Sequence, residues 1–166
     1  MSHFRKILNG YFGECLKHSL FLCSNTLLSI GAYIVIREEA LDWFEEAKVD
    51  YERALRSLRD KDYSLACYMC HQAIEKAFKA VMIGLKRKRP PHAHDLTFLY
   101  ENIRDIIKLS SDIEEALPEI SQYYVTARYP NAGLKRPSLS FSKAQAKKAL
   151  EVARSVLEKV EKALTT

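Results

Sequence analysis

The sequence is poor in the two residues that break helices, with five glycines and five prolines among 166 residues. It also lacks the two glycine-rich phosphate motifs, G-x-x-x-x-G-K-[ST] and G-x-G-x-x-G, which excludes a phosphate cradle built in either of those ways. Long segments without breakers favour helices over a sheet of many strands. The composition therefore predicts an all-α protein in which side chains make any phosphate contacts.

Length and charge set few limits on the partner. The net charge of +5 permits an anionic ligand without requiring one, and 48% hydrophobic with 28% charged residues is ordinary for a soluble domain.

A chain of this length can bury one core without disulfides. We therefore interpret the cysteines as small apolar side chains in a reducing, cytoplasmic compartment; they are Cys15, Cys23, Cys67 and Cys70.

One uncharged stretch near the N-terminus differs from the rest of the chain. Residues 19–36 (SLFLCSNTLLSIGAYIVI) follow a basic flank and have about the minimum length of a membrane span. Polar residues interrupt the middle of the stretch, and no small-x-small cleavage site follows it. Three interpretations stay open: an extension without a specified role, a helix packed on the domain, and a membrane or export segment. We divide the chain into an apolar N-terminal extension, residues 1–36, and a helical domain, residues 37–166, and expect no membrane partner.

From residue 37 onward, apolar residues recur at steps of three and four, the spacing of one face of a helix. This spacing predicts helices over residues 37–58, 63–86, 95–107, 112–126 and 143–160, with His94 or Asp95 opening the third. Capping boxes are predicted at Ser111–Glu114 and Ser142–Gln145. One long loop covers residues 128–141. The predicted architecture is an antiparallel up-and-down bundle of four to five helices.

The second predicted helix contains a motif that is typical of a cofactor site. Cys67, Cys70 and His71 form the C-x-x-C-H pattern that attaches a c-type haem. Haem attachment requires export, and the N-terminal extension is a poor signal peptide, so we expect core or interface cysteines instead. His92 and His94 lie two residues apart in a proline-rich turn, which is not the spacing of ligands on a helix. We therefore predict no metal and no cofactor.

The end of the fourth predicted helix concentrates residues suited to nucleic acid. Tyr124, Arg128 and Tyr129 can stack on bases and contact phosphate, while Lys135 and Arg136 add positive charge. The competing interpretation is that the tyrosines pack the bundle and Arg128 pairs with a carboxylate. The sequence does not separate these two interpretations.

Several of these residues together resemble the HEPN family, whose name records a nucleotide-binding role in higher eukaryotes and prokaryotes. The likeness covers residues 37–166 and rests on W-x3-A-x2-D at 43–50, HQAIEKAFKA at 71–80, H-x-L at 94–96 and RYP at 128–130. It implies the archaeal or bacterial stand-alone type, a homodimer, and a minimal nucleotidyltransferase partner, in some cases as a toxin–antitoxin pair. The candidate nucleotide- or RNA-binding residues are Arg128, Tyr129, Tyr124, Lys135, Arg136, His71, Lys79 and His94.

The sequence departs from the family at one functional position. Many relatives resemble one another as metal-independent ribonucleases with an R-x(4–6)-H motif, and Arg128 takes the arginine position, but residues 133–135 are Gly, Leu and Lys. Cleavage through the 2′-hydroxyl needs a base at neutral pH and a cation for the developing charge, and this loop offers only the cation. We therefore expect a non-catalytic module without catalytic residues that binds a nucleotide, RNA or a nucleotidyltransferase. The alternatives are a ribonuclease whose base is His71 or His94, and a structural dimer without a ligand.

Overall fold

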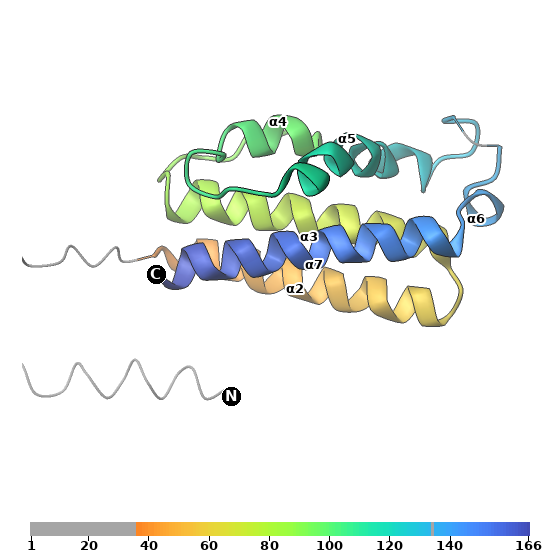
Figure 1. Cartoon of the computed structure of the whole chain (residues 1–166), viewed down its shortest axis with the longest axis horizontal. Coiled ribbons are helices and arrows are strands. Elements are labelled where there is room, and N and C mark those ends of the chain that lie inside the picture. Colours follow the sequence, from red (N-terminus) through yellow and green to blue (C-terminus); the bar gives the residue numbers. More distant parts are fainter. Residues whose placement is uncertain (1–35, 134) are drawn as a thin grey trace, which may run out of the picture. The chain divides into compact units, whose positions relative to one another are not determined.

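A computed structural model describes residues 36–133 and 135–166, which form a bundle of helices (Figure 1). The long helices are α2 (Glu38–Arg59), α3 (Tyr63–Gly84) and α7 (Lys143–Thr165), and the shorter ones are α4 (Leu96–Glu101), α5 (Ser111–Thr126) and α6 (Pro137–Ser140). The described residues contain no strand. The predicted all-α class is confirmed.

Helix α3 is the centre of the bundle. It packs against α2 and α7 along its length and also contacts α4, α5 and α6. Its buried residues occupy nearly every side of the helix, as expected for a helix that other helices surround. Helices α2 and α7 each bury a single stripe, which is apolar on α7 and also includes Asp50 and Ser57 on α2. The core therefore lies around α3, with Ile74 and Phe78 fully buried at its centre.

The third helix is shorter than predicted. Helix α4 ends at Glu101, and residues 102–106 form turns instead of continuing to 107. Its start is confirmed at Asp95, whose side chain accepts hydrogen bonds from the backbone N–H groups of Thr97 and Phe98. Ile103 and Ile107 are nevertheless buried. The apolar spacing thus predicted the burial of these two isoleucines correctly, although the backbone that carries them is not helical.

One of the two predicted capping boxes forms. At Ser142 the side chain accepts a hydrogen bond from the Gln145 backbone, and the Gln145 side chain caps Ser142 in return. The predicted box at Ser111 is wrong, because Ser110 is the N-cap and its side chain makes no capping bond. The Glu114 carboxylate instead accepts a hydrogen bond from the Tyr100 hydroxyl at 2.7 Å. The predicted long loop also contains the short helix α6.

The cysteines of α3 are core residues, as predicted. Cys67 and Cys70 are fully buried and free, and burial raises the pKa of Cys67 to about 12. Cys15 and Cys23 lie outside the described residues, and so does the apolar stretch 19–35 with the interpretations attached to it. None of the helices described here has the length and apolar character needed to cross a bilayer.

Candidate functional site

Helix α3 carries a row of buried polar side chains on one face. His71, Glu75 and Lys79 follow one another at steps of four residues, and they are 0%, 5% and 6% exposed. Lys79 Nζ lies 2.7 Å from Glu75 Oε1. Buried charges are tolerated in a fold only when they are paired. Glu75 is therefore the anion around which this row of side chains is organised.

The second partner of Glu75 comes from the turn before α4. His94 Nδ1 lies 3.2 Å from Glu75 Oε1 and 3.1 Å from Oε2. A carboxylate only accepts, so Nδ1 carries the hydrogen of this contact, and Nε2 is the remaining acceptor of the neutral ring. The His94 side chain is 46% exposed. Glu75 thus fixes the orientation of an imidazole that reaches solvent.

His71 supports the same turn. Its Nε2 donates a hydrogen bond to the His94 carbonyl at 2.8 Å, and its Nδ1 accepts from the Gln72 amide at 3.3 Å. Burial lowers the pKa of His71, because it removes water from the charged form. With no exposed surface and both ring nitrogens engaged, His71 holds the His94 turn and offers no atom to a ligand.

Tyr124 on α5 separates His94 from Arg128. The His94 and Tyr124 rings stack with centroids 3.9 Å apart and an 11° angle between their planes. The Arg128 guanidinium carbon lies 4.2 Å from the centre of the same tyrosine ring. One face of a phenol ring has room for one planar group at this distance, so the imidazole and the guanidinium occupy opposite faces. We call this arrangement the His94–Tyr124–Arg128 stack.

Arg128 is held by aromatic rings and backbone. Its guanidinium carbon also lies 4.8 Å from the Tyr68 ring centre and 4.9 Å from that of Tyr129, and its Nε donates to the Tyr124 carbonyl at 2.6 Å. No carboxylate of the described residues forms an ion pair with it. The interpretation that Arg128 pairs with a carboxylate therefore fails for the described chain. The other part of that interpretation, that the tyrosines pack the bundle, applies to the neighbouring Tyr123, which is 5% exposed.

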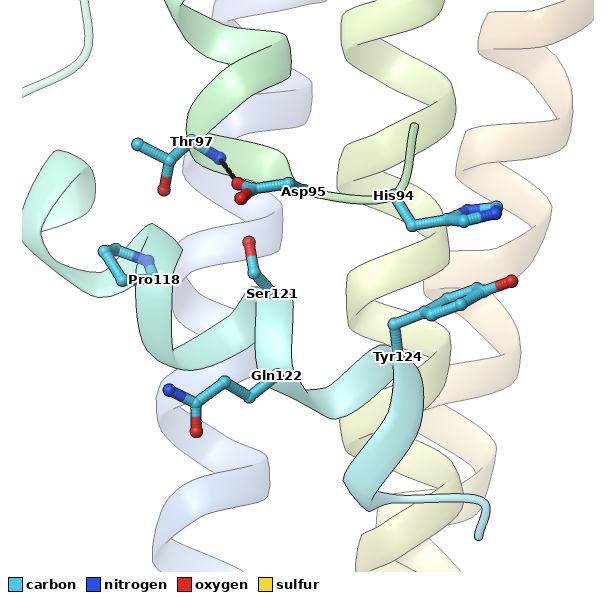
Figure 2. Close-up of a pocket in the computed structure, with 7 residues that line it drawn as sticks. All are labelled: His94, Asp95, Thr97, Pro118, Ser121, Gln122 and Tyr124. Carbon is cyan, nitrogen blue, oxygen red and sulfur yellow. Dashed lines mark hydrogen bonds between the residues drawn. The ribbon is translucent and has the colours of Figure 1, made fainter. Parts of the chain in front are cut away.

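A cavity of about 400 Å³ adjoins the stack (Figure 2). Figure 2 shows the His94 and Tyr124 rings lying parallel on one side of it, with Pro118 on the other. Ser121 accepts a hydrogen bond from the Leu96 backbone, which joins α5 to the start of α4. Its lining residues carry polar side chains except for Pro118; they are His94, Asp95, Thr97, Pro118, Ser121, Gln122 and Tyr124.

The remaining sequence candidates are dispersed. Lys135 and Arg136 are exposed ahead of α6, and neither forms an ion pair with a described residue.

Two residues of the site, Glu75 and Tyr68, were not among the candidates predicted from the sequence. Glu75 could have been found, because it lies midway between His71 and Lys79 on one helical face. Among the residues described, no cluster of histidine, cysteine and acidic side chains could hold a metal ion.

Comparisons with known proteins agree with this architecture. The HEPN domain model matches residues 40–163. The crystal structure of TT1696 from Thermus thermophilus has a TM-score of 0.69 at 30% identity, over 77% of this chain and 100% of that chain. The crystal structure of ST0689, an archaeal HEPN homologue, has a similar fold, with a TM-score of 0.61 at 22% identity, over 75% of this chain and 97% of that one. No curated protein matches. The chain therefore belongs to the HEPN domain family.

Proposed function

We propose that this chain is a non-catalytic HEPN module that binds a nucleotide or RNA at Arg128. The observation that carries the proposal is the state of the Arg128 guanidinium, which lies against three tyrosine rings and has no described carboxylate to neutralise it. A guanidinium fixed through Nε keeps its terminal N–H groups for a phosphate, which it binds in a forked geometry.

Exposed aromatic faces flank this guanidinium. Tyr129 is 53% exposed, and the His94 side chain is 46% exposed on the opposite side of Tyr124. Both rings present a face on which a base can stack, and stacking of this kind tolerates any base. Tyr124 is covered on both faces, so its role in the proposal is to position the two ligand-contacting groups.

Geometry favours binding over cleavage. His71 is completely buried, and His94 is separated from Arg128 by the thickness of the Tyr124 ring. Neither imidazole hydrogen bonds to the guanidinium. A scissile phosphate held by Arg128 would have to reach around the edge of Tyr124 before His94 could take a 2′-hydroxyl proton.

One observation keeps a ribonuclease as the second candidate. Glu75 holds His94 Nδ1 and leaves Nε2 without a partner among the described residues, which is how an oriented general base is arranged. In that case His94 would accept the 2′-hydroxyl proton and Arg128 would stabilise the developing phosphorane charge.

Calorimetry with AMP, ATP and a short single-stranded RNA tests the binding proposal. We expect saturable binding that weakens at least tenfold in Arg128→Ala, less in Arg128→Lys, and not at all in Arg104→Ala, which removes an exposed arginine of the α4–α5 connection. Absence of binding to all three probes, or equal binding by Arg128→Ala, would remove the proposal. Cleavage of the RNA that is lost in His94→Gln would replace it with the ribonuclease.

A homodimer and a nucleotidyltransferase partner, including one in a toxin–antitoxin pair, are further parts of the proposal that rest on the family. Exposed apolar side chains near the site offer surface for a second copy, with Val125 at 43% exposure and Leu139 at 70%. Light scattering tests the dimer, and Leu139→Glu is the variant to compare. A monomeric mass for the wild-type chain would remove this part without affecting nucleotide binding.

A further inference from the structure

A second cavity of the domain differs in chemical character from the one beside the stack. It measures about 680 Å³ and is formed where the α4–α5 connection meets the C-terminal turns of α7 and the end of α3. Figure 1 shows the α4–α5 connection and the end of α7 at the same end of the bundle. Its lining shares no residue with the cavity beside the stack; it consists of Leu85, Ile106, Ile107, Lys108, Lys159, Lys162, Ala163 and Thr166.

The floor of this cavity is apolar. Ile107 is 4% exposed, while Leu85, Ile106 and Ala163 are partly buried and pack against the core. Its volume falls in the range of small-molecule sites, which are mostly apolar with a few polar groups that fix the ligand's orientation. An uncharged or apolar group of a ligand therefore suits the interior.

Lysines surround the apolar floor. Lys159 and Lys162 stand three residues apart on one face of α7, and Lys108 reaches the rim from the α4–α5 connection. None of the three forms an ion pair with a described carboxylate. The Asp105 carboxylate of the α4–α5 connection is bound to Lys86 at 2.7 Å, and Lys108 interacts with it only at longer range. The partial negative charge at the C-terminal end of α7 accounts for Lys162, which lies in the last turn of that helix. It does not account for Lys108, which lies outside the helix.

We infer that this lysine-rimmed cavity binds an anionic amphiphile, a molecule with an acyl chain and one anionic head group. The chain would cover the leucine, isoleucine and alanine floor, which lowers the free energy by removing apolar surface from water. The head group would lie among the three ammonium groups, none of which forms an ion pair with a described carboxylate. This site is independent of nucleotide binding at Arg128.

The full-length chain and a fluorescent dansyl-labelled fatty acid, used below its micelle concentration, test the inference. We expect saturable binding with one molecule per chain, displaced by dodecanoate and at least tenfold less well by dodecanol, which lacks the charge. The double variant Lys159→Glu/Lys162→Glu should bind at least tenfold more weakly. The matched double variant Lys143→Glu/Lys147→Glu, which changes two exposed lysines near the other end of α7, should bind within twofold of wild type.

Three results would overturn the inference. The first is the absence of saturable binding to the full chain. The second is equal displacement by dodecanoate and dodecanol. The third is equal weakening by Lys143→Glu/Lys147→Glu and by Lys159→Glu/Lys162→Glu, which would reduce the effect to general charge. Circular dichroism of each variant confirms that the helices are retained, and Ala163→Trp, which fills the cavity, provides a second blocking variant.

Discussion

The His94 imidazole lies flat on the Tyr124 ring, 3.9 Å from centroid to centroid, while the Arg128 guanidinium covers the other face of the same ring. The tyrosine is therefore the shared support of the two groups that the proposed function places in contact with a ligand. Its hydroxyl forms no hydrogen bond with a described residue, and Figure 2 shows it pointing away from the cavity centre.

Replacing this ring tests its supporting role. We expect Tyr124→Leu to destabilise the domain by about 1–2 kcal/mol, because it removes one stacking and one cation–π contact. Tyr124→Phe keeps both contacts and should change stability by less than about 0.5 kcal/mol. Urea denaturation measures the stability. The ring-current shift of the His94 ring protons, measured by NMR, should persist in Tyr124→Phe and disappear in Tyr124→Leu; its persistence in both would place His94 elsewhere.

The helices could be predicted from the sequence more completely than the contacts of the site. The apolar spacing of α2 and α7 was sufficient because each of these helices buries one stripe against its neighbours, while α3 is buried on nearly every side. At 102–107 the same spacing marks burial without a helix, since turns can also direct isoleucines inward. Arg128 and Tyr129 could be named together as candidates because they are adjacent in the chain.

The side-chain contacts of the site depend on the tertiary fold, so local sequence patterns do not predict them. The spacing places Glu75 on one face with His71 and Lys79, but its burial and its contact with His94 depend on the turn that folds over α3. The partnership of His94 with Tyr124 depends on how α5 crosses α3, and no local pattern encodes that crossing. The Arg128 environment likewise includes Tyr68, which comes from α3.

The buried pair of Glu75 and Lys79 predicts a large cost for removing one partner. Glu75→Gln should destabilise the domain by about 3–5 kcal/mol, because it leaves the Lys79 ammonium buried without its counter-charge. Adding Lys79→Met should recover at least about 1 kcal/mol in a double-mutant cycle. The exposed pair of Arg154 and Glu158 is the control, and Glu158→Gln should destabilise the domain much less than Glu75→Gln does. Equal costs for the two glutamate variants in urea denaturation would contradict the burial of the Glu75 pair.

The lowered pKa of His71 predicts a loss of stability in acid. Because the folded pKa lies below the ordinary value of 6.5, the unfolded chain binds the proton more readily than the folded chain. The free energy of unfolding therefore falls as pH decreases from about 6.5 toward the folded pKa. In His71→Gln this part of the pH dependence should be smaller than in wild type.

The control for this titration is His92, which is exposed in the turn that leads to α4. A change of pH dependence in His71→Gln that exceeds the change in His92→Gln would assign it to the buried ring. Denaturation curves at several pH values between 7 and 5 provide the comparison, with each variant measured against wild type at the same pH. A His71→Gln variant that loses as much stability in acid as wild type would show that other groups cause the acid sensitivity.

The raised pKa of the α3 thiols predicts that they are inert in the folded protein. In a Cys15→Ser/Cys23→Ser background, a disulfide reagent at pH 8 should label Cys67 and Cys70 only when the protein unfolds. A pKa of about 12 for Cys67 leaves roughly one thiolate in ten thousand at that pH, and burial also blocks access of the reagent. Labelling rates in increasing urea should therefore follow the unfolded fraction measured by circular dichroism. Rapid labelling without urea would place these cysteines outside the core and would reopen haem attachment at the C-x-x-C-H pattern.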